Sequence, residues 1–195
     1  MTAQARVATS FGPAARTMFA SGVLALIGVV FLVAMYIAFA IGATSAGEVL
    51  GRVNDVLIMV AYPLAIPGLI ALRSVVHPHA PITSDLAVLI AIGAIGAIAI
   101  LQAALVLHWL TFEEQVGPVS VALLALGVSL VAIGFAGRSG GVLPGGLRMG
   151  LIGATYLGYP LWAWWAGRQI ERRNPAPAMP GPSLARYPRV DDRPR

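Results

Sequence analysis

The chain has 195 residues, of which 58% are hydrophobic and only 11% are charged, whereas soluble domains are about 25% charged. So little polar surface excludes an ordinary soluble fold, and membrane lipid is the expected outer solvent. All 13 basic residues are arginine, the net charge is +5 and there is no cysteine, which excludes lysine Schiff bases, disulfides, thiolate metal sites and cysteine nucleophiles.

The first predicted membrane helix covers residues 18–43. Residues 17–47 contain no charged side chain, and this stretch is longer than the roughly 20 residues that a spanning helix needs. A cleaved signal peptide is the alternative, because Thr44, Ser45 and Ala46 would suit a cleavage site. The apolar region of a signal peptide is only about 7–15 residues long, so the sequence favours a retained helix.

The next three predicted helices cover residues 55–73, 85–110 and 119–137. Pro63 and Pro67 interrupt the first of these, and because proline lacks an amide donor we expect a kink at residues 62–67. Polar residues 83–85 are candidates to cap the start of the next helix. Pro118 marks the expected start of the last of the three, since proline is well suited to a first helical position.

The fifth predicted helix covers residues 148–167. Trp162, Trp164 and Trp165 precede Arg168, a combination typical of a helix end at the lipid headgroups. The expected organisation is therefore all-α, a bundle of five transmembrane helices, with an N-terminal tail of residues 1–16, a membrane domain of residues 17–168 and a C-terminal tail of residues 169–195. The tail is rich in proline and arginine and is expected to be disordered.

Small residues spaced four apart predict where helices pack closely, because they share one helix face and let backbones approach. Three segments carry such residues: Ala34, Ala38 and Gly42; Gly93 with Ala97 and Ala99 with Ala103; and Gly150, Ala154 and Gly158. Contacts within the chain are the favoured interpretation, and a homo-oligomer is the alternative.

The charges do not settle which way the chain faces. Five crossings would put the N-terminus with loops 74–84 and 138–148 on one side, and loops 44–54 and 111–118 with the C-terminal tail on the other. Arginines near the helix ends are then divided almost equally between the two sides. The positive-inside rule needs an imbalance of such arginines, so orientation stays open.

Histidines and carboxylates give two candidate clusters outside the apolar stretches. His77 and His79 precede Asp85, but this pattern is too sparse for a metal site, and we assign neither a metal nor a cofactor. The stronger cluster gathers loop residues expected on one face: Glu48, Arg52, Asp55, His108, Glu113 and Glu114, with Arg168 and Arg172 from the end of the fifth helix. Its candidate catalytic residues are His108, Glu113, Glu114 and Asp55.

Carboxylates beside a histidine could act as general acid and base or bind a cation, although solvated loop charges are the commoner explanation. Between the charged residues at their ends, the predicted spans place no Asp, Glu, Lys or Arg inside the hydrocarbon region, which argues against ion-coupled transport. Of the polar residues in them, we expect Gln102 to form an interhelical hydrogen bond. The sequence contains no H-E-x-x-H, G-x-S-x-G or P-loop motif, which favours binding or assembly over catalysis.

The C-terminal part of the predicted membrane domain resembles the last helix of small, uncharacterised multi-helix membrane proteins of bacteria. The resemblance is carried by Leu143-Pro144-Gly145-Gly146-Leu147-Arg148, by Gly158-Tyr159-Pro160-Leu161-Trp162-Ala163 and by Trp165-Ala166-Gly167-Arg168. Many members of these families have six helices rather than five, and they have no agreed activity. The resemblance implies a multi-pass protein of a bacterial inner (plasma) membrane.

Three functions remain open on the sequence alone. The favoured one is a non-enzymatic membrane component or accessory subunit. The alternatives are a channel or carrier for a small neutral or apolar solute, and a lipid-modifying enzyme with its site at the acidic membrane boundary. Expected partners are membrane lipids, including anionic headgroups at the arginine-rich ends, and another membrane protein or a second copy of the chain; nucleic acid is not expected.

Overall fold

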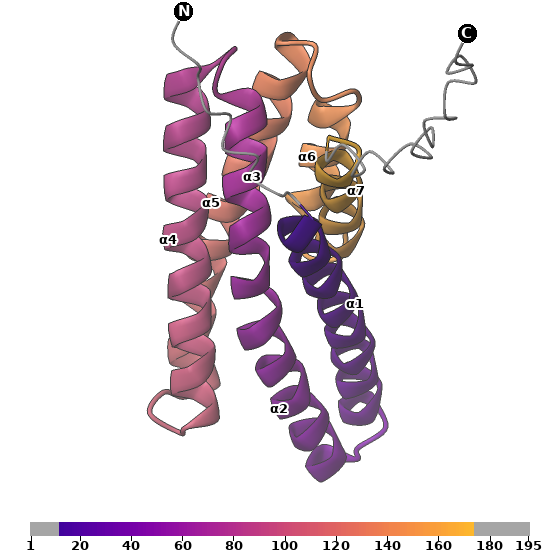
Figure 1. Ribbon diagram of the computed structural model, residues 1–195. Helices are drawn as coiled ribbons and strands as arrows, with labels where there is room; N and C mark the ends of the chain where they lie inside the picture. Colours follow the sequence, from indigo (N-terminus) through magenta and orange to yellow (C-terminus); the bar gives the residue numbers. More distant parts are fainter. Residues whose placement is uncertain (1–11, 174–195) are drawn as a thin grey trace, which may run out of the picture.

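The structure is a computed structural model and describes residues 12–173, all of whose regular elements are helical (Figure 1). The elements are α1 (Gly12–Ala40), α2 (Thr44–Ala61), the 3-10 turn η1 (Pro63–Ala65), α3 (Ile66–Val76), α4 (Pro81–Val106), α5 (Phe112–Ser139), α6 (Gly146–Gly153) and α7 (Tyr159–Glu171). The expected all-α fold is confirmed. The remaining residues, including most of the expected C-terminal tail, lie outside the described range.

Within residues 12–173, four segments are long and apolar enough to cross a membrane, and the expected number of five is wrong. They are Gly12–Ala40, Thr44–Val76, Pro81–Val106 and Phe112–Ser139. Each of their helices starts before the position expected from the sequence. The second segment differs most, because α2 already begins at Thr44 and includes residues that we expected in a loop.

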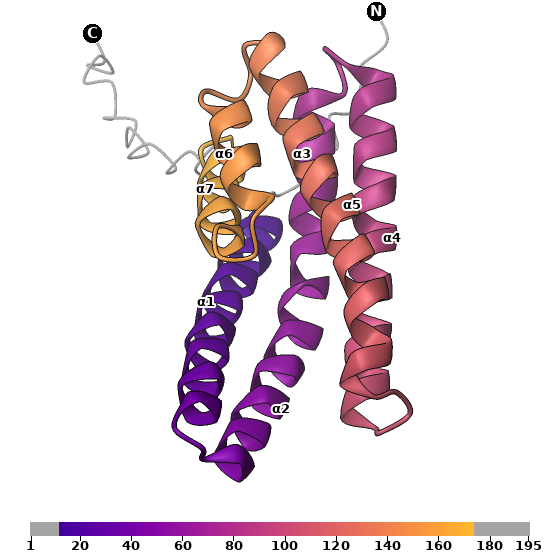
Figure 2. The same ribbon diagram turned by 180° about the vertical axis from the view of Figure 1, so that it is seen from behind.

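The fifth predicted helix, 148–167, is instead a hairpin of two short helices (Figure 2). With eight residues in α6 and 13 in α7, the two helices are about 12 and 20 Å long, less than the roughly 30 Å hydrocarbon core. The chain reverses because Gly158 packs its backbone against the Ile152 carbonyl, where no larger residue fits. Thr155 caps the turn by accepting from the Gly158 amide at 3.0 Å, and Pro160 starts α7.

Close helix contacts hold this hairpin against the rest of the bundle. Gly146 and Gly134 bring the backbones of α6 and α5 into direct contact, and Gly150 lies on the Leu130 carbonyl of α5. Ala154, at the hairpin tip, packs on Gly127 near the middle of α5. The small-residue pattern at positions 150 and 154 therefore predicted a real contact, whereas a side chain at Gly93 would meet open space.

The expected kink is confirmed in the second spanning segment. The 3-10 turn η1 separates α2 from α3, and the helix axis changes direction there (Figure 1). The prediction for the start of α5 is wrong, because Thr111 and Glu114 form a capping box that begins the helix at Phe112 and leaves Pro118 inside it. Capping satisfies the first-turn amides, so proline is not needed to start this helix.

The hairpin brings both ends of the described chain to the same end of the bundle. Phe19 of α1 packs on Gly167 of α7, so the start of α1 lies beside the end of α7. Arg173 donates a hydrogen bond to the Val142 carbonyl in the α5–α6 loop. That loop in turn meets the α3–α4 loop, where Gly140 contacts His79. The opposite end is formed by the α1–α2 and α4–α5 turns (Figure 1).

Candidate functional site

The two ends of the bundle carry opposite charge. The first, which we call the arginine end, has seven arginines and two carboxylates, a net +5: Arg16, Arg73, Arg138, Arg148, Arg168, Arg172 and Arg173 with Asp85 and Glu171. The other, which we call the acidic end, has one arginine and three carboxylates, a net −2: Arg52 with Glu48, Glu113 and Glu114. Five crossings would have divided the arginines almost equally between the two ends, whereas the structure places seven at one end and one at the other.

The four candidate catalytic residues do not form one site. His108 lies in the α4–α5 turn with a left-handed backbone, φ 59°. Glu114 caps α5, where its carboxylate accepts the Thr111 amide at 2.8 Å. Glu113 and Glu114 are both exposed. Within residues 12–173 no hydrogen bond or ion pair joins any two of the four candidates.

Asp55 lies apart from the others because it is inside the second spanning segment. It follows the first residue of α2 by 11 positions, or about 16 Å of helix, and precedes Tyr62 by seven. Its side chain is half-buried. The expected boundary at residue 55 is wrong, because the helix starts at Thr44 and includes Asp55.

The histidines of the arginine end belong to an ion-pair cluster. Asp85 Oδ1 accepts from Arg73 Nε at 2.7 Å and lies 2.9 Å from His77 Nδ1. Asp85 thus links α3 to α4 instead of capping α4. His79 packs on Gly140, and residues 12–173 contain no group of three or more histidine and acidic residues placed to hold a metal.

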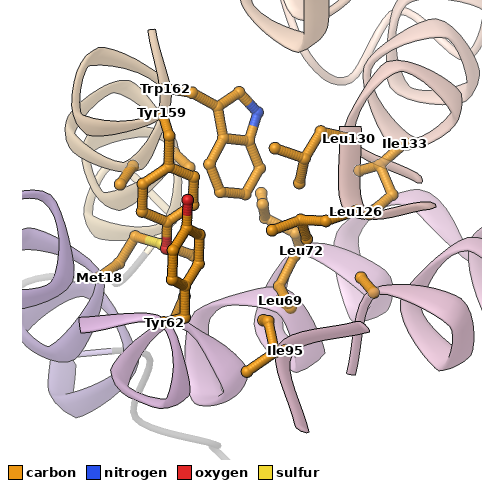
Figure 3. Packing of buried hydrophobic residues seen from close by; sticks show 14 of the residues in the cluster. Met18, Tyr62, Leu69, Leu72, Ile95, Leu126, Leu130, Ile133, Tyr159 and Trp162 are labelled. Atoms are coloured by element: carbon orange, nitrogen blue, oxygen red, sulfur yellow. The ribbon is translucent and has the colours of Figure 1, made fainter. Parts of the chain in front are cut away.

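Two buried tyrosines, Tyr62 at the α2–α3 break and Tyr159 at the start of α7, pack together in the bundle interior beside Trp162 (Figure 3). The rings of Tyr62 and Tyr159 lie 4.5 Å apart between centroids, and Trp162 lies 6.0 Å beyond Tyr159. The Tyr159 hydroxyl is 2.7 Å from the Ser21 hydroxyl of α1. These contacts join α1, α2 and α7 in the interior of the bundle.

A second polar contact lies just below the tyrosines, towards the acidic end. Tyr156 in the hairpin turn donates a hydrogen bond from its hydroxyl to Asn54 Oδ1 at 3.3 Å. Asn54 is 5% exposed and faces Gly28 of α1. A cavity of about 30 Å³ borders Tyr62, Tyr156 and Tyr159, which is room for a water molecule or two.

Sequence reasoning missed Asn54 and Ser21, although a signal for Asn54 existed. A spacing of four, three and four residues marks one face of a helix, and it is followed by Gly47, Gly51, Asn54 and Ile58. Recognising this face would have moved the predicted start of the second helix to an earlier residue. Gln102 does form its expected interhelical bond, since its side-chain oxygen accepts from Gln115 Nε2 at 2.9 Å. Nothing in the sequence identifies the partner of Ser21, which is 138 residues away.

No protein-family model, curated protein or solved structure matches this chain.

Proposed function

We propose that the chain is a non-enzymatic component of a bacterial plasma membrane whose arginine end faces the cytoplasm and binds anionic lipid headgroups. The observation that carries this proposal is the segregation of seven arginines to one end of the bundle and three carboxylates to the other. Arginine near helix ends marks the cytoplasmic side. Each arginine near an anionic surface contributes about 1 kcal/mol, so the arginine end favours an anionic leaflet.

Trp164 and Arg168 support this placement of the arginine end. The Arg168 guanidinium lies 4.0 Å from the centroid of the Trp164 ring, a cation–π contact that keeps the charge close to an aromatic ring. Tryptophan prefers the headgroup region. The pair therefore suits the boundary where α7 meets the lipid headgroups.

Cysteine labelling tests the orientation directly, because the chain has no cysteine of its own. Ser139 at the arginine end and Ser45 at the acidic end are both exposed, so Ser139→Cys and Ser45→Cys form a matched pair. With an impermeant maleimide on intact cells, we expect Ser45→Cys to react and Ser139→Cys to react only after permeabilisation. The reverse pattern would contradict the proposed orientation.

Lipid binding is tested by the lipids that remain on the purified protein. Arg138 and Arg148 are exposed at the arginine end, and Arg52 is exposed at the acidic end. We expect the double variant Arg138→Gln/Arg148→Gln to retain less phosphatidylglycerol than the wild type, whereas Arg52→Gln retains as much. Equal retention by all three proteins would reject headgroup binding at the arginine end.

A carrier is the second candidate, and one observation favours it. The tip of a half-depth hairpin meets an interrupted helix at Tyr62 and Tyr159, and interrupted helices at this depth form the substrate sites of many transporters. Against a carrier, the cavity beside the tip is only about 30 Å³. A lipid-modifying enzyme is disfavoured because Asp55 stands apart from His108 and Glu113.

A further inference from the structure

We propose that an apolar groove between α5 and the tip of the α6–α7 hairpin binds one acyl chain of an anionic phospholipid whose phosphate lies at Arg138 and Arg148. This inference deepens the lipid binding proposed above and rests on it. It is carried by the volume and lining of the groove, by its depth along α5 and by the position of the two arginines.

The groove is apolar and large enough to hold part of an acyl chain. It has a volume of about 200 Å³ and is lined by Leu124, Gly127, Val128, Val131 and Ala154. None of these residues has a polar side chain. Because an apolar cavity of about 150 Å³ can hold a benzene ring, the groove has room for roughly six to eight methylene groups.

The packing of the hairpin tip on α5 creates the groove. A carbon added at Gly127 would stand 3.1 Å from the Ala154 Cβ, so the two chains touch here through their smallest side chains. Leu124 and Val128 flank this contact and are 68% and 61% exposed. The small residues therefore leave a hollow between larger side chains, and it opens on the outer surface of the bundle.

The depth of the groove matches the depth of a lipid chain that starts at the arginine end. Arg138 lies in the last turn of α5, and Val131 and Leu124 precede it by seven and 14 residues, so all three lie on nearly the same helix face. The groove therefore extends from about 10 to about 21 Å below Arg138. One leaflet takes up about half of the roughly 30 Å hydrocarbon core, so a chain that hangs from Arg138 reaches the groove with its far half.

The two arginines above the groove complement a phosphate. Gly134, one turn before Arg138, touches the Gly146 backbone, and Arg148 follows Gly146 by two residues, so both arginines lie near this contact. Both are exposed, and the two ion pairs among residues 12–173 involve neither of them. Arginine binds phosphate through charge-assisted hydrogen bonds, so a headgroup held here places its chains over the groove.

A lipid chain fits the groove better than a helix of a partner protein. Helices in a membrane pack closely where small residues let their backbones approach, and a helix with its side chains is about 10–12 Å wide. Leu124 and Val128 project from the rim of the groove and would hold such a helix away from Gly127. A single acyl chain is narrow enough to lie between them.

Native mass spectrometry of the full-length, delipidated protein tests the groove with two phosphatidylglycerols that share one headgroup. The chains of the dipalmitoyl lipid are long enough to fill the groove. Those of the dihexanoyl lipid end above Val128, which lies ten residues, or about 15 Å, below Arg138. The fraction of protein that carries one lipid, measured over a range of lipid concentrations, gives a Kd for each lipid.

Val128→Trp fills the groove, and Val121→Trp is its matched control. Val121 lies seven residues earlier on the same face of α5, is 68% exposed and does not line the groove. We expect Val128→Trp to bind the dipalmitoyl lipid about fivefold more weakly than Val121→Trp, because roughly ten carbon–carbon contacts of the chain are lost. Both variants should bind the dihexanoyl lipid equally. Equal affinity of the two variants for the dipalmitoyl lipid, or an equal loss for both lipids, would overturn the groove, as would a second copy of the chain bound in place of lipid.

The double variant Arg138→Gln/Arg148→Gln separates the groove from the headgroup site. We expect it to weaken the binding of both lipids, since both carry the same phosphate. Unchanged binding of both lipids by this double variant would reject the headgroup binding proposed above and the two arginines as the phosphate site. Weaker binding by the double variant, with no selective loss in Val128→Trp, would reject the groove alone.

Discussion

Replacing Gly150 by alanine should destabilise the membrane domain, because α6 and α5 touch at this residue. A methyl carbon at position 150 would stand 2.7 Å from the Leu130 carbonyl oxygen and 2.9 Å from the Val131 Cα atom. Ordinary contact begins at 3.4 Å, so the new carbon is about 0.7 Å too close, and the atoms it meets belong to the backbone and cannot rotate away.

The expected cost follows from this overlap. Overpacking costs about 1–3 kcal/mol, and we expect the upper half of that range because α6 as a whole must move away from α5. Gly96→Ala is the matched control, since Gly96 is also helical but a methyl group there meets nothing within 4 Å. Alanine favours helix over glycine by about 0.5–1 kcal/mol, so Gly96→Ala should be neutral or slightly stabilising.

Equilibrium unfolding of both variants in mixed detergent micelles measures the difference in the free energy of unfolding. We expect Gly150→Ala to lie at least about 2 kcal/mol below Gly96→Ala, which combines the overpacking cost with the helix preference. Equal stability of the two variants would mean that α6 does not rest on α5 as described, and the hairpin arrangement would have to be abandoned.

Two further predictions concern hydrogen bonds. Gln115→Leu should lower the free energy of unfolding by about 0.5–1.5 kcal/mol, because it leaves the buried Gln102 without its partner. The double variant Gln102→Leu/Gln115→Leu should recover part of this loss. A further loss of stability in the double variant would contradict the explanation. Thr111→Ala should lower the free energy of unfolding by about 1 kcal/mol in the same assay, because it removes the oxygen that caps the start of α5. The control Ser120→Ala removes an exposed hydroxyl that is hydrogen-bonded within the helix. It should change the free energy of unfolding by less than about 0.5 kcal/mol.

The all-α fold with long apolar helices and the kinked second segment could be predicted from the sequence. Long runs without charge specify spanning helices because an unpaired backbone or charged group in hydrocarbon is costly wherever it lies in the chain. Pro63 and Pro67 likewise act locally, since the missing amide donor disrupts the helix that contains them. Predictions of this kind need no knowledge of neighbouring segments.

The boundaries were less predictable because polar residues are tolerated at helix ends. Asp55 seemed to mark a loop, yet α2 continues for 11 residues before it. The helix can include Asn54 since its side chain faces α1 and the hairpin turn instead of lipid. The surface that this helix packs against cannot be inferred from the sequence of the segment alone.

Only the tertiary structure decided that residues 148–167 turn back inside the bundle. Their composition suits one spanning helix as well as two short ones, and the choice depends on whether other helices offer a place for the tip. Gly127 of α5 accommodates Ala154, and Tyr62 at the α2–α3 break accommodates Tyr159.

The candidate site and the charge imbalance follow from that same turn. It brings Tyr156 to Asn54, 102 residues earlier in the chain, and returns Arg168 to the end that already holds Arg73 and Arg138. Hydropathy is a local property of a segment, so the sequence by itself determined that this chain has helices apolar enough to cross a membrane. How deep each segment reaches and what it meets there depend on packing between distant segments, which only the folded bundle specifies.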